Sequence, residues 1–269
     1  MIIDTHSHIY LNTHQSIDEI VSWLKNDWIE KIISIGINLE TSQKCIDMAK
    51  KYPGIIYATV WIHPCDVKEA GEIHDVIQKL EQLYLENKEF VVGIWETGYD
   101  FYHNSLEDYE KEKNIQEQFF TAQIELAKKY SLPLIIHTRN SKNEVFETLQ
   151  KNNAKKYILH CFSEDLEFAK KNIEYSSECK ISFSWIVTYK SALEVQKTAS
   201  SIPYSRIIVE TDSPYLAPQP VRGTQNIPNN TRYTLEKVYE LQKQNWLDMI
   251  FDEFMKQIYQ NSLDIFGLK

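Results

Sequence analysis

Ile2-Ile3-Asp4-Thr5-His6-Ser7-His8 opens the chain with the pattern of a short buried strand that ends in polar residues. Alternate residues of a strand face the same side, so His6 and His8 project together. Two imidazoles at this spacing can share a metal ion. An H-x-H pair alone is a weak indication, because two ordinary histidines would look the same. The pair gains weight because further candidate ligands follow at the ends of later predicted strands.

Short apolar strands alternate with helical segments along the rest of the chain. The predicted strands after the first are 31–37, 55–61, 90–95, 132–136, 157–159, 180–183 and 206–209. The predicted helices are 16–28 (or 18–28), 41–51, 73–86, 107–130, 141–152, 164–173 and 190–200, with two closing helices after about residue 230. This alternation favours a parallel sheet covered by helices. We therefore predict an α/β fold, a (β/α)8 TIM barrel that forms a single domain over residues 1–269.

Polar residues that could bind a metal follow most of the predicted strands. These residues are His6, His8, His63, Glu96, His137, His160 and Asp212. In a TIM barrel, functional residues lie at the carboxyl ends of the strands. A doubly wound open sheet is the alternative fold, but it would keep the ends of the first and last strands apart. A barrel closes the last strand against the first and brings Asp212 beside His6 and His8.

Six of these side chains suit two divalent ions that lie close together. The expected arrangement is His6, His8 and Asp212 on one ion, His137 and His160 on the other, and Glu96 between them. Each residue has an ordinary structural alternative; Glu96 could cap a turn and Asp212 could cap a helix. All of these alternatives would have to fall at the same end of one barrel, so the pattern favours a metal site.

The composition is that of an ordinary globular protein without special partners. The formal net charge of −9 gives no general attraction for nucleic acid or for an anionic membrane. No apolar run approaches the ~18 residues of a spanning helix, and the chain begins directly with the first strand. The 4 cysteines show no C-x-x-C spacing. We therefore expect a reduced, cytoplasmic protein with no obligate protein partner.

Seven motifs resemble those of the TatD-type deoxyribonuclease family, in the same order. They are D-T-H-S-H (4–8), I-H-P (62–64), E-T-G-Y-D-F-Y (96–102), H-T-R (137–139), H-C-F-S (160–163), E-T-D-S-P-Y-L-A-P (210–218) and R-G-T-Q-N-I-P (222–228). The resemblance runs from residue 2 to about 230 and plausibly to the end. It implies a metal-dependent TIM-barrel hydrolase of the amidohydrolase-like group. It also implies that His6, His8, Glu96, His137, His160 and Asp212 bind metal.

The resemblance further implies a nuclease that removes nucleotides from DNA ends in the 3′ to 5′ direction. The cofactors would be two divalent ions, Mg²⁺, Mn²⁺ or Zn²⁺, which activate a water molecule. Asp212 would accept a proton, and Glu96 would bridge the ions. His63, Arg139 and Arg222 are candidates to contact the phosphate or the leaving group, although both arginines could have purely structural roles.

Two other functions stay open. An amidohydrolase-type ester, lactone or amide hydrolase could use the same ligands, because the metals activate water for either electrophile. A barrel that has lost catalysis and only binds a ligand is disfavoured by the complete ligand set.

Tryptophan replaces glycine at several places where the family usually has glycine. These places are Trp61, Trp95 and Trp185, and Trp28 and Trp246 stand where a helix-ending glycine would be natural. The chain has only 7 glycines, well under the average of roughly 7%. The sequence could belong to a divergent member with widened pockets. We prefer the hypothesis that the source reads UGA as glycine and that these tryptophans are an artefact of translation.

Overall fold

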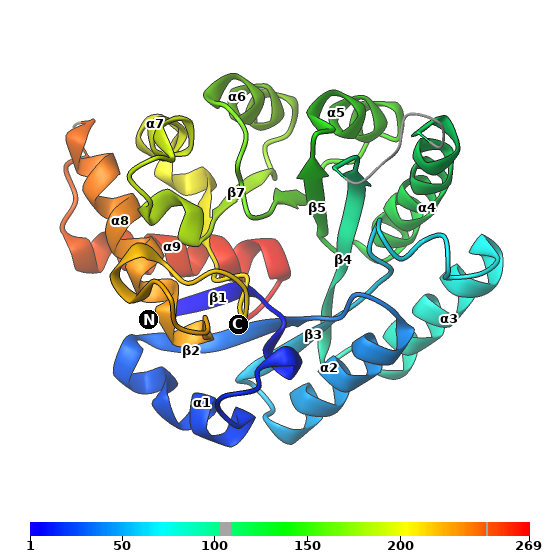
Figure 1. Cartoon of the computed structure of the whole chain (residues 1–269), viewed down its shortest axis with the longest axis horizontal. Helices are drawn as coiled ribbons and strands as arrows, with labels where there is room; N and C mark the ends of the chain where they lie inside the picture. The colour runs from blue at the N-terminus through cyan, green and yellow to red at the C-terminus, as the bar shows by residue number, and fades with distance from the viewer. Residues whose placement is uncertain (103–108, 246) are drawn as a thin grey trace.

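Eight parallel strands follow one another in chain order around a barrel in the computed structural model (Figure 1). The structure describes residues 1–102, 109–245 and 247–269, without the side chains of Lys25 and Trp95. The strands are β1 (Ile2–Ser7), β2 (Ile29–Ile35), β3 (Ile56–Val60), β4 (Val91–Asp100), β5 (Leu134–Arg139), β6 (Tyr157–Leu159), β7 (Lys180–Phe183) and β8 (Ile207–Val209).

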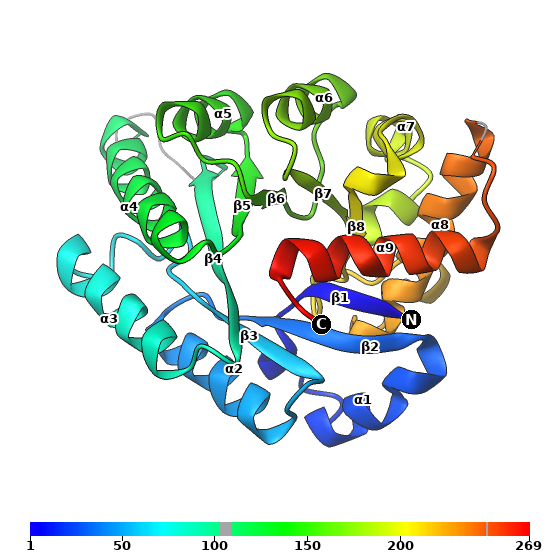
Figure 2. The ribbon, with the colours of Figure 1, turned by 180° about the vertical axis from the view of Figure 1, so that it is seen from behind.

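Helices cover the outside of this barrel (Figures 1 and 2). They are α1 (Ile17–Trp23), α2 (Leu39–Lys51), α3 (Ile73–Glu86), α4 (Tyr109–Tyr130), α5 (Lys142–Lys151), α6 (Leu166–Tyr175), α7 (Leu193–Ser201), α8 (Thr231–Gln244) and α9 (Phe251–Phe266). Short 3-10 helices are η1 (Ile9–Leu11), η2 (Leu24–Asp27), η3 (Trp185–Thr188), η4 (Tyr204–Arg206), η5 (Gln219–Val221) and η6 (Pro228–Asn230). In the described part of the chain, no helix is both long and apolar enough to cross a membrane.

The first strand and the segment after the last strand close the barrel. The Asp212 N–H donates to the His6 carbonyl at 2.9 Å, and the His8 N–H donates to the Ser213 carbonyl at 2.7 Å. The Thr5 hydroxyl donates to the Val209 carbonyl at 3.0 Å. Helix α9 packs against both β1 and β8, and Figure 2 shows it lying across this seam. The predicted TIM barrel is confirmed over the open-sheet alternative.

The strands form because their side chains are buried on both faces of the sheet. Ile32, Ile33 and Ile35 of β2 are fully buried, one face lying inside the barrel and the other under the helices. Such strands read as nearly continuous apolar runs, which is why the sequence revealed them. The predicted boundaries of β6, β7 and α3 match the structure, and most others differ by a few residues. The predicted helix at 107–130 begins in residues 107–108, which lie outside the described part, and α4 is described from Tyr109.

The predicted end of the fourth strand at Trp95 was wrong. Strand β4 continues to Asp100, which pairs with Arg139 of β5. The residues after Trp95 are mostly polar, so the sequence indicated a loop. They pair with β5 nevertheless, because the carboxyl end of β4 lies at the polar mouth of the barrel and not in an apolar core.

The tryptophans occupy different environments. Trp28 follows η2 and has a left-handed backbone with φ of 64°, a conformation that favours glycine. Trp61 is 1% exposed and Trp185 is partly buried, and the indole Nε1 atom of each has no hydrogen-bond partner among the described residues. Trp246 and the side chain of Trp95 lie outside the description.

Candidate metal centre

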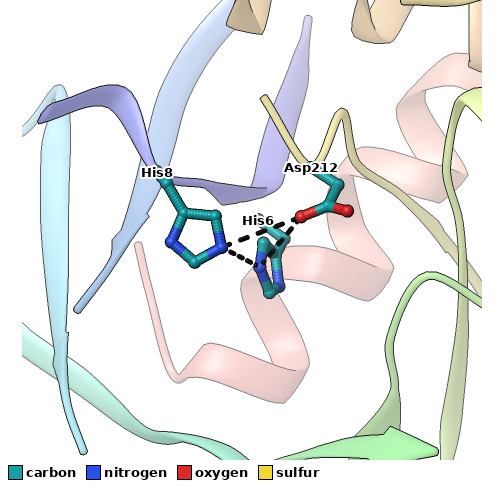
Figure 3. A group of neighbouring side chains, drawn as sticks. All are labelled: His6, His8 and Asp212. Carbon is teal, nitrogen blue, oxygen red and sulfur yellow. Dashed lines mark hydrogen bonds and ion pairs between the residues drawn. The ribbon is translucent and has the colours of Figure 1, made fainter. Parts of the chain in front are cut away.

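His6, His8 and Asp212 form a first group of candidate ligands that point toward one another (Figure 3). The Nε2 atoms of His6 and His8 are 3.1 Å apart. Asp212 Oδ1 lies 3.5 Å from His6 Nε2 and 3.7 Å from His8 Nε2. Closure of the barrel thus brings together donor atoms from the ends of the first and the last strand, as the order of the strands predicted.

Glu96 lies between this group and the remaining imidazoles. Its Oε2 atom is 4.0 Å from His6 Nε2, and its Oε1 atom is 2.9 Å from His137 Nδ1. Glu96 Oε1 also contacts His160 Nε2. The ring of His160 stacks on that of His6, with 4.4 Å between the centroids. His6, Glu96 and His160 form a second group of donors, and the place of Glu96 suits a bridging carboxylate.

His63, Glu96 and His137 form a third group. His63 Nε2 lies 3.8 Å from Glu96 Oε2, and the rings of His63 and His137 are 4.9 Å apart between centroids. The sequence placed His63 with the residues that contact substrate. Because His63 lies so close to the candidate ligands, the orientation of its ring nitrogens decides whether it can bind a metal or donate a hydrogen bond.

Two irregularities in the strands aim these side chains inward. Glu96 is an extra residue in β4, because Trp95 and Thr97 pair with consecutive residues of β5. In β1, Thr5 and His6 together lie opposite a single residue of β2. An extra residue of this kind re-aims a side chain and is common beside active sites.

The residues just after β6 and β8 have unusual backbone angles. Cys161, which follows His160, has φ of 40°, and Asp212 has φ of 56°. Non-glycine residues seldom adopt this left-handed region, and examples cluster at functional sites. At Asp212 the backbone N–H bonds to the carbonyl of His6, so the same turn closes the barrel and presents the carboxylate.

The partners of the outer ring nitrogens set which nitrogen faces the centre. His8 Nδ1 donates to the Ile35 carbonyl at 3.0 Å, which leaves the Nε2 lone pair facing Asp212. His137 Nε2 donates to Asp100 Oδ2 at 3.0 Å, and its Nδ1 bonds to Glu96 Oε1 at 2.9 Å, so Nδ1 is the nitrogen that faces the centre and would release its proton to bind an ion. A metal-binding histidine commonly donates its other N–H to a carbonyl or a carboxylate in this way.

His63 has the opposite arrangement. The backbone N–H of Cys65 donates to His63 Nδ1 at 3.1 Å, so that nitrogen carries no proton. Burial lowers the pKa of His63 to about 4, so the ring is neutral near pH 7 and its single proton sits on Nε2. His63 therefore presents an N–H to the cavity, whereas His8 presents a lone pair.

The electrostatics of the cluster suit a divalent cation. Burial lowers the pKa of His6 and of His8, which keeps both rings neutral and able to coordinate. Burial also acts to raise the pKa of Glu96, but His160, His63 and His137 hold it well below its usual value. Burial raises the pKa of Asp212 to about 8. Burial acts to lower the pKa of His137 and of His160 too, but Asp100 and Glu96 raise that of His137, and Glu96 and Glu210 raise that of His160, so an ion bound there would displace a proton. Imidazoles and buried carboxylates within coordination distance of one another are the donor set that such an ion requires.

A cavity of about 1380 Å³ opens above the centre. Its lining includes the candidate ligands His8, Glu96, His137, His160 and Asp212, together with His63, Arg139 and Arg222. The guanidinium of Arg139 lies 3.8 Å from the ring centroid of Tyr102, and that of Arg222 lies 5.3 Å from that of Tyr189. The structure thus brings every predicted site residue to one cavity, apart from His6, which is fully buried beside it.

Two buried carboxylates of the site were missed from the sequence. Asp100 bonds to His137, and Glu210 Oε1 lies 3.6 Å from His160 Nδ1. Glu210 also accepts the backbone N–H of Cys161 and the hydroxyl of Ser182. Their positions in E-T-G-Y-D and E-T-D, beside Glu96 and Asp212, were the available signal, because alternate residues near a strand end share a face.

The chain is similar to several known proteins over most or all of its length. The family model described as TatD related DNase matches residues 3–267. The uncharacterized metal-dependent hydrolase YabD of Bacillus subtilis is 30% identical over 271 residues, covering 100% of both chains. An uncharacterized metal-dependent hydrolase of Mycoplasma genitalium is 32% identical over 243 residues, which is 88% of this chain and 90% of the relative. The crystal structure of YjjV, a TatD homologue from Escherichia coli, superposes with a TM-score of 0.86 at 24% identity and covers 100% of this chain and 98% of its own.

Proposed function

The chain belongs to the TatD-related DNase family of metal-dependent hydrolases, and we propose that it cleaves phosphodiester bonds of DNA. The proposed reaction removes nucleotides one at a time from the free 3′ end of a single strand. The observation that carries this proposal is the placement of Arg139 and Arg222 in the cavity above the candidate ligands. A protein with a net charge of −9 needs such local cations to hold a phosphate chain.

In this proposal, His6, His8 and Asp212 would hold one ion. His137 and His160, each of which contacts Glu96, would hold a second, with Glu96 between the two. Divalent ions bound there would lower the pKa of a water ligand and offset the charge that develops on the phosphate. Mg²⁺, Mn²⁺ and Zn²⁺ are the candidate ions.

The side chains then have separate tasks. Asp212, whose side chain is 18% exposed, faces the cavity and accepts the proton of the attacking water. His63 donates its Nε2 proton in a hydrogen bond to a phosphate oxygen or to the leaving oxygen. Arg139 and Arg222 hold phosphates with charge-assisted hydrogen bonds.

A labelled oligonucleotide tests the proposal. A single-stranded DNA 20-mer with a 5′ label, incubated with metal-loaded protein, should give a ladder that shortens from the 3′ end. A chelator should stop the reaction, and added Mg²⁺, Mn²⁺ or Zn²⁺ should restore it. A 3′-blocked oligonucleotide and a closed circle are the controls and should stay intact.

The same preparation should be offered carboxylic ester, lactone and amide substrates. No cleavage of DNA beside rapid ester hydrolysis would refute the proposal and favour the amidohydrolase alternative. Cutting of the closed circle would refute the 3′-end mode of action and keep the nuclease.

A further inference from the structure

Asp100 stands between the candidate metal centre and a candidate substrate-binding side chain. It is the last residue of β4 and is 4% exposed. Its Oδ2 atom accepts the Nε2–H of His137 at 3.0 Å and lies 3.8 Å from Arg139 Nη1. Its Oδ1 atom accepts the backbone N–H of Tyr102 at 3.0 Å. One buried carboxylate therefore lies against a candidate metal ligand (His137), a candidate substrate-binding residue (Arg139) and the backbone of Tyr102.

The backbone of Asp100 is itself fixed from outside the barrel. Gln116 of α4 is 4% exposed. Its Oε1 accepts the Asp100 N–H at 3.0 Å, and its Nε2 donates to the Asp100 carbonyl at 3.2 Å. A buried side-chain amide that satisfies both backbone groups of one residue fixes the position of that residue. Helix α4 thus helps to fix the backbone that carries this carboxylate.

The contacts on the cavity side continue to Tyr102. The guanidinium of Arg139 lies over the Tyr102 ring at 3.8 Å from its centroid, and the Tyr102 backbone bonds to Asp100. Arg139 is therefore placed by a carboxylate on one side and by an aromatic face on the other. Arg222 lies over Tyr189, and within the described residues no carboxylate lies within ion-pair distance of it.

We propose that Asp100 is a positioning residue that couples the metal centre to the substrate. Through His137 it fixes the ring so that Nδ1 faces Glu96, and through Arg139 it directs a guanidinium into the cavity. The first half of the proposal concerns His137 alone. The second half rests on the proposed function, because it takes Arg139 as a phosphate-binding residue.

Metal titration and steady-state kinetics of three variants separate the two halves. Asp100→Ala should weaken binding of Mn²⁺ or Zn²⁺ to one of two sites by ~10–100-fold, as removal of such outer partners does. It should also raise the KM for single-stranded DNA. Arg139→Ala should raise the KM and leave metal binding unchanged. Arg222→Ala, the matched control, should also raise the KM without affecting metal binding.

The double variant tests the coupling directly. In an Arg139→Ala background, Asp100→Ala should raise the KM little further but should still weaken metal binding. Asp100→Asn serves as a second variant if Asp100→Ala does not fold. The amide of Asn has one acceptor oxygen, whereas the Asp100 carboxylate accepts the N–H groups of both His137 and Tyr102. Asp100→Asn should therefore change metal binding in the same direction as Asp100→Ala.

Unchanged metal affinity in folded Asp100→Ala and Asp100→Asn would overturn the proposal. Fully additive effects on KM in the double variant would overturn the coupling to Arg139. A fall in metal affinity in a protein that never cleaves DNA would overturn the proposed function and, with it, the coupling to Arg139. It would support the half that concerns His137, because the metal titration involves no nucleic acid.

Discussion

At the scale of single residues, one hydrogen bond decides what each histidine of the site can do. His8 donates Nδ1–H to a backbone carbonyl, whereas His63 accepts a backbone N–H at the same ring atom. The two imidazoles face the same cavity with opposite groups, a lone pair and a proton. Proximity to the candidate carboxylates alone, Asp212 for His8 and Glu96 for His63, would assign both to the metal, so the orientation of the ring is what separates a candidate ligand from a hydrogen-bond donor.

This difference predicts opposite results for two alanine variants. His8→Ala should lower the affinity for Mn²⁺ or Zn²⁺ at least tenfold, because it removes a ligand atom. His63→Ala should leave metal affinity within about twofold and should lower kcat, because a hydrogen bond to the reacting group is lost. Isothermal titration with metal and initial-rate kinetics measure the two effects. A large loss of metal affinity in His63→Ala would show that His63 is a ligand.

Trp28 gives a second test at the residue scale. Its φ of 64° is costly for a side chain with a Cβ atom, by ~1–2 kcal/mol. Trp28→Gly should remove that cost, and it gives up the contacts of a ring that is 37% exposed, among them an edge contact with Phe251. We expect a net gain of ~1 kcal/mol in the free energy of unfolding, seen as a rise of a few degrees in Tm.

Trp23 is the matched control, because Trp23 and Trp28 are both 37% exposed but Trp23 has an ordinary helical backbone. Trp23→Gly should therefore lower the Tm. A Tm of Trp28→Gly at or below that of the wild type would contradict the argument. The codons settle the question of origin, since UGG at positions 28, 61, 95 and 185 would rule out reassigned glycine and UGA would support it.

At the scale of elements, the pairing of β4 with β5 positions much of the site. Gly98 pairs with His137, and Asp100 pairs with Arg139. The candidate metal ligand in the polar E-T-G-Y-D segment could be predicted from the sequence. The strand formed by this segment could not, because strand prediction depends on apolar residues. The extra residues in β1 and β4 could not be foreseen either. They depend on how each strand is aligned with its neighbour, and the residues of one strand alone do not determine that alignment.

Gly98 is the residue that permits this pairing. It has φ of 137°, and a Cβ atom there would lie 2.1 Å from the carbonyl oxygen of His137. Gly98→Ala should push β4 away from β5, lower the free energy of unfolding by ~2–4 kcal/mol and weaken metal binding through His137. Denaturant unfolding and metal titration measure both effects.

Gly54→Ala is the control for the backbone effect alone. Gly54 also has positive φ, 77°, but a Cβ atom there would meet nothing within 4 Å. Its substitution should cost only the ~1–2 kcal/mol of the left-handed conformation and should leave metal binding unchanged. Equal losses of stability in the two variants would show that the contact with His137 has no effect.

At the scale of the whole molecule, chain order and strand alternation were enough to predict which residues meet. The barrel was predictable because its strands are apolar on both faces, as in Ile207–Val209. The convergence of His6, His8 and Asp212 followed from closing that barrel. The outer partners of the histidines were not predictable, because they include backbone groups such as the Ile35 carbonyl, which have no signal in a sequence.

The fold also controls the reactivity of the thiols. Burial raises the pKa of Cys45, Cys65 and Cys179 to about 12, and burial also raises that of Cys161 well above its usual value. At pH 8 the thiolate is then scarce, so native protein should react with iodoacetamide far more slowly than a free cysteine. In guanidinium chloride all 4 thiols should react at the ordinary rate.

Cys65 shows whether reagent access or thiol ionisation limits labelling. Its side chain is exposed, but its partly desolvated surroundings and the nearby Asp100 raise the pKa of its thiol. Its labelling should accelerate as the pH rises from 9 toward 12. Over the same range the unfolded chain loses thiol protons before the native protein does, so the free energy of unfolding should fall with pH. Rapid labelling of native Cys65 at pH 8, followed by mass spectrometry, would contradict the raised pKa.

The seam between β1 and the segment after β8 also sets the moment in synthesis at which the first group of candidate ligands can be complete. Thr5 and Val209, which bond across this seam, are 204 residues apart. A ribosome that adds ~5–20 residues per second needs roughly 10–40 seconds to cover that span. Throughout that time the nascent chain carries both amino-terminal imidazoles without Asp212. A polypeptide released by a stop codon before residue 212 is therefore left without the carboxylate that completes the first group of candidate ligands.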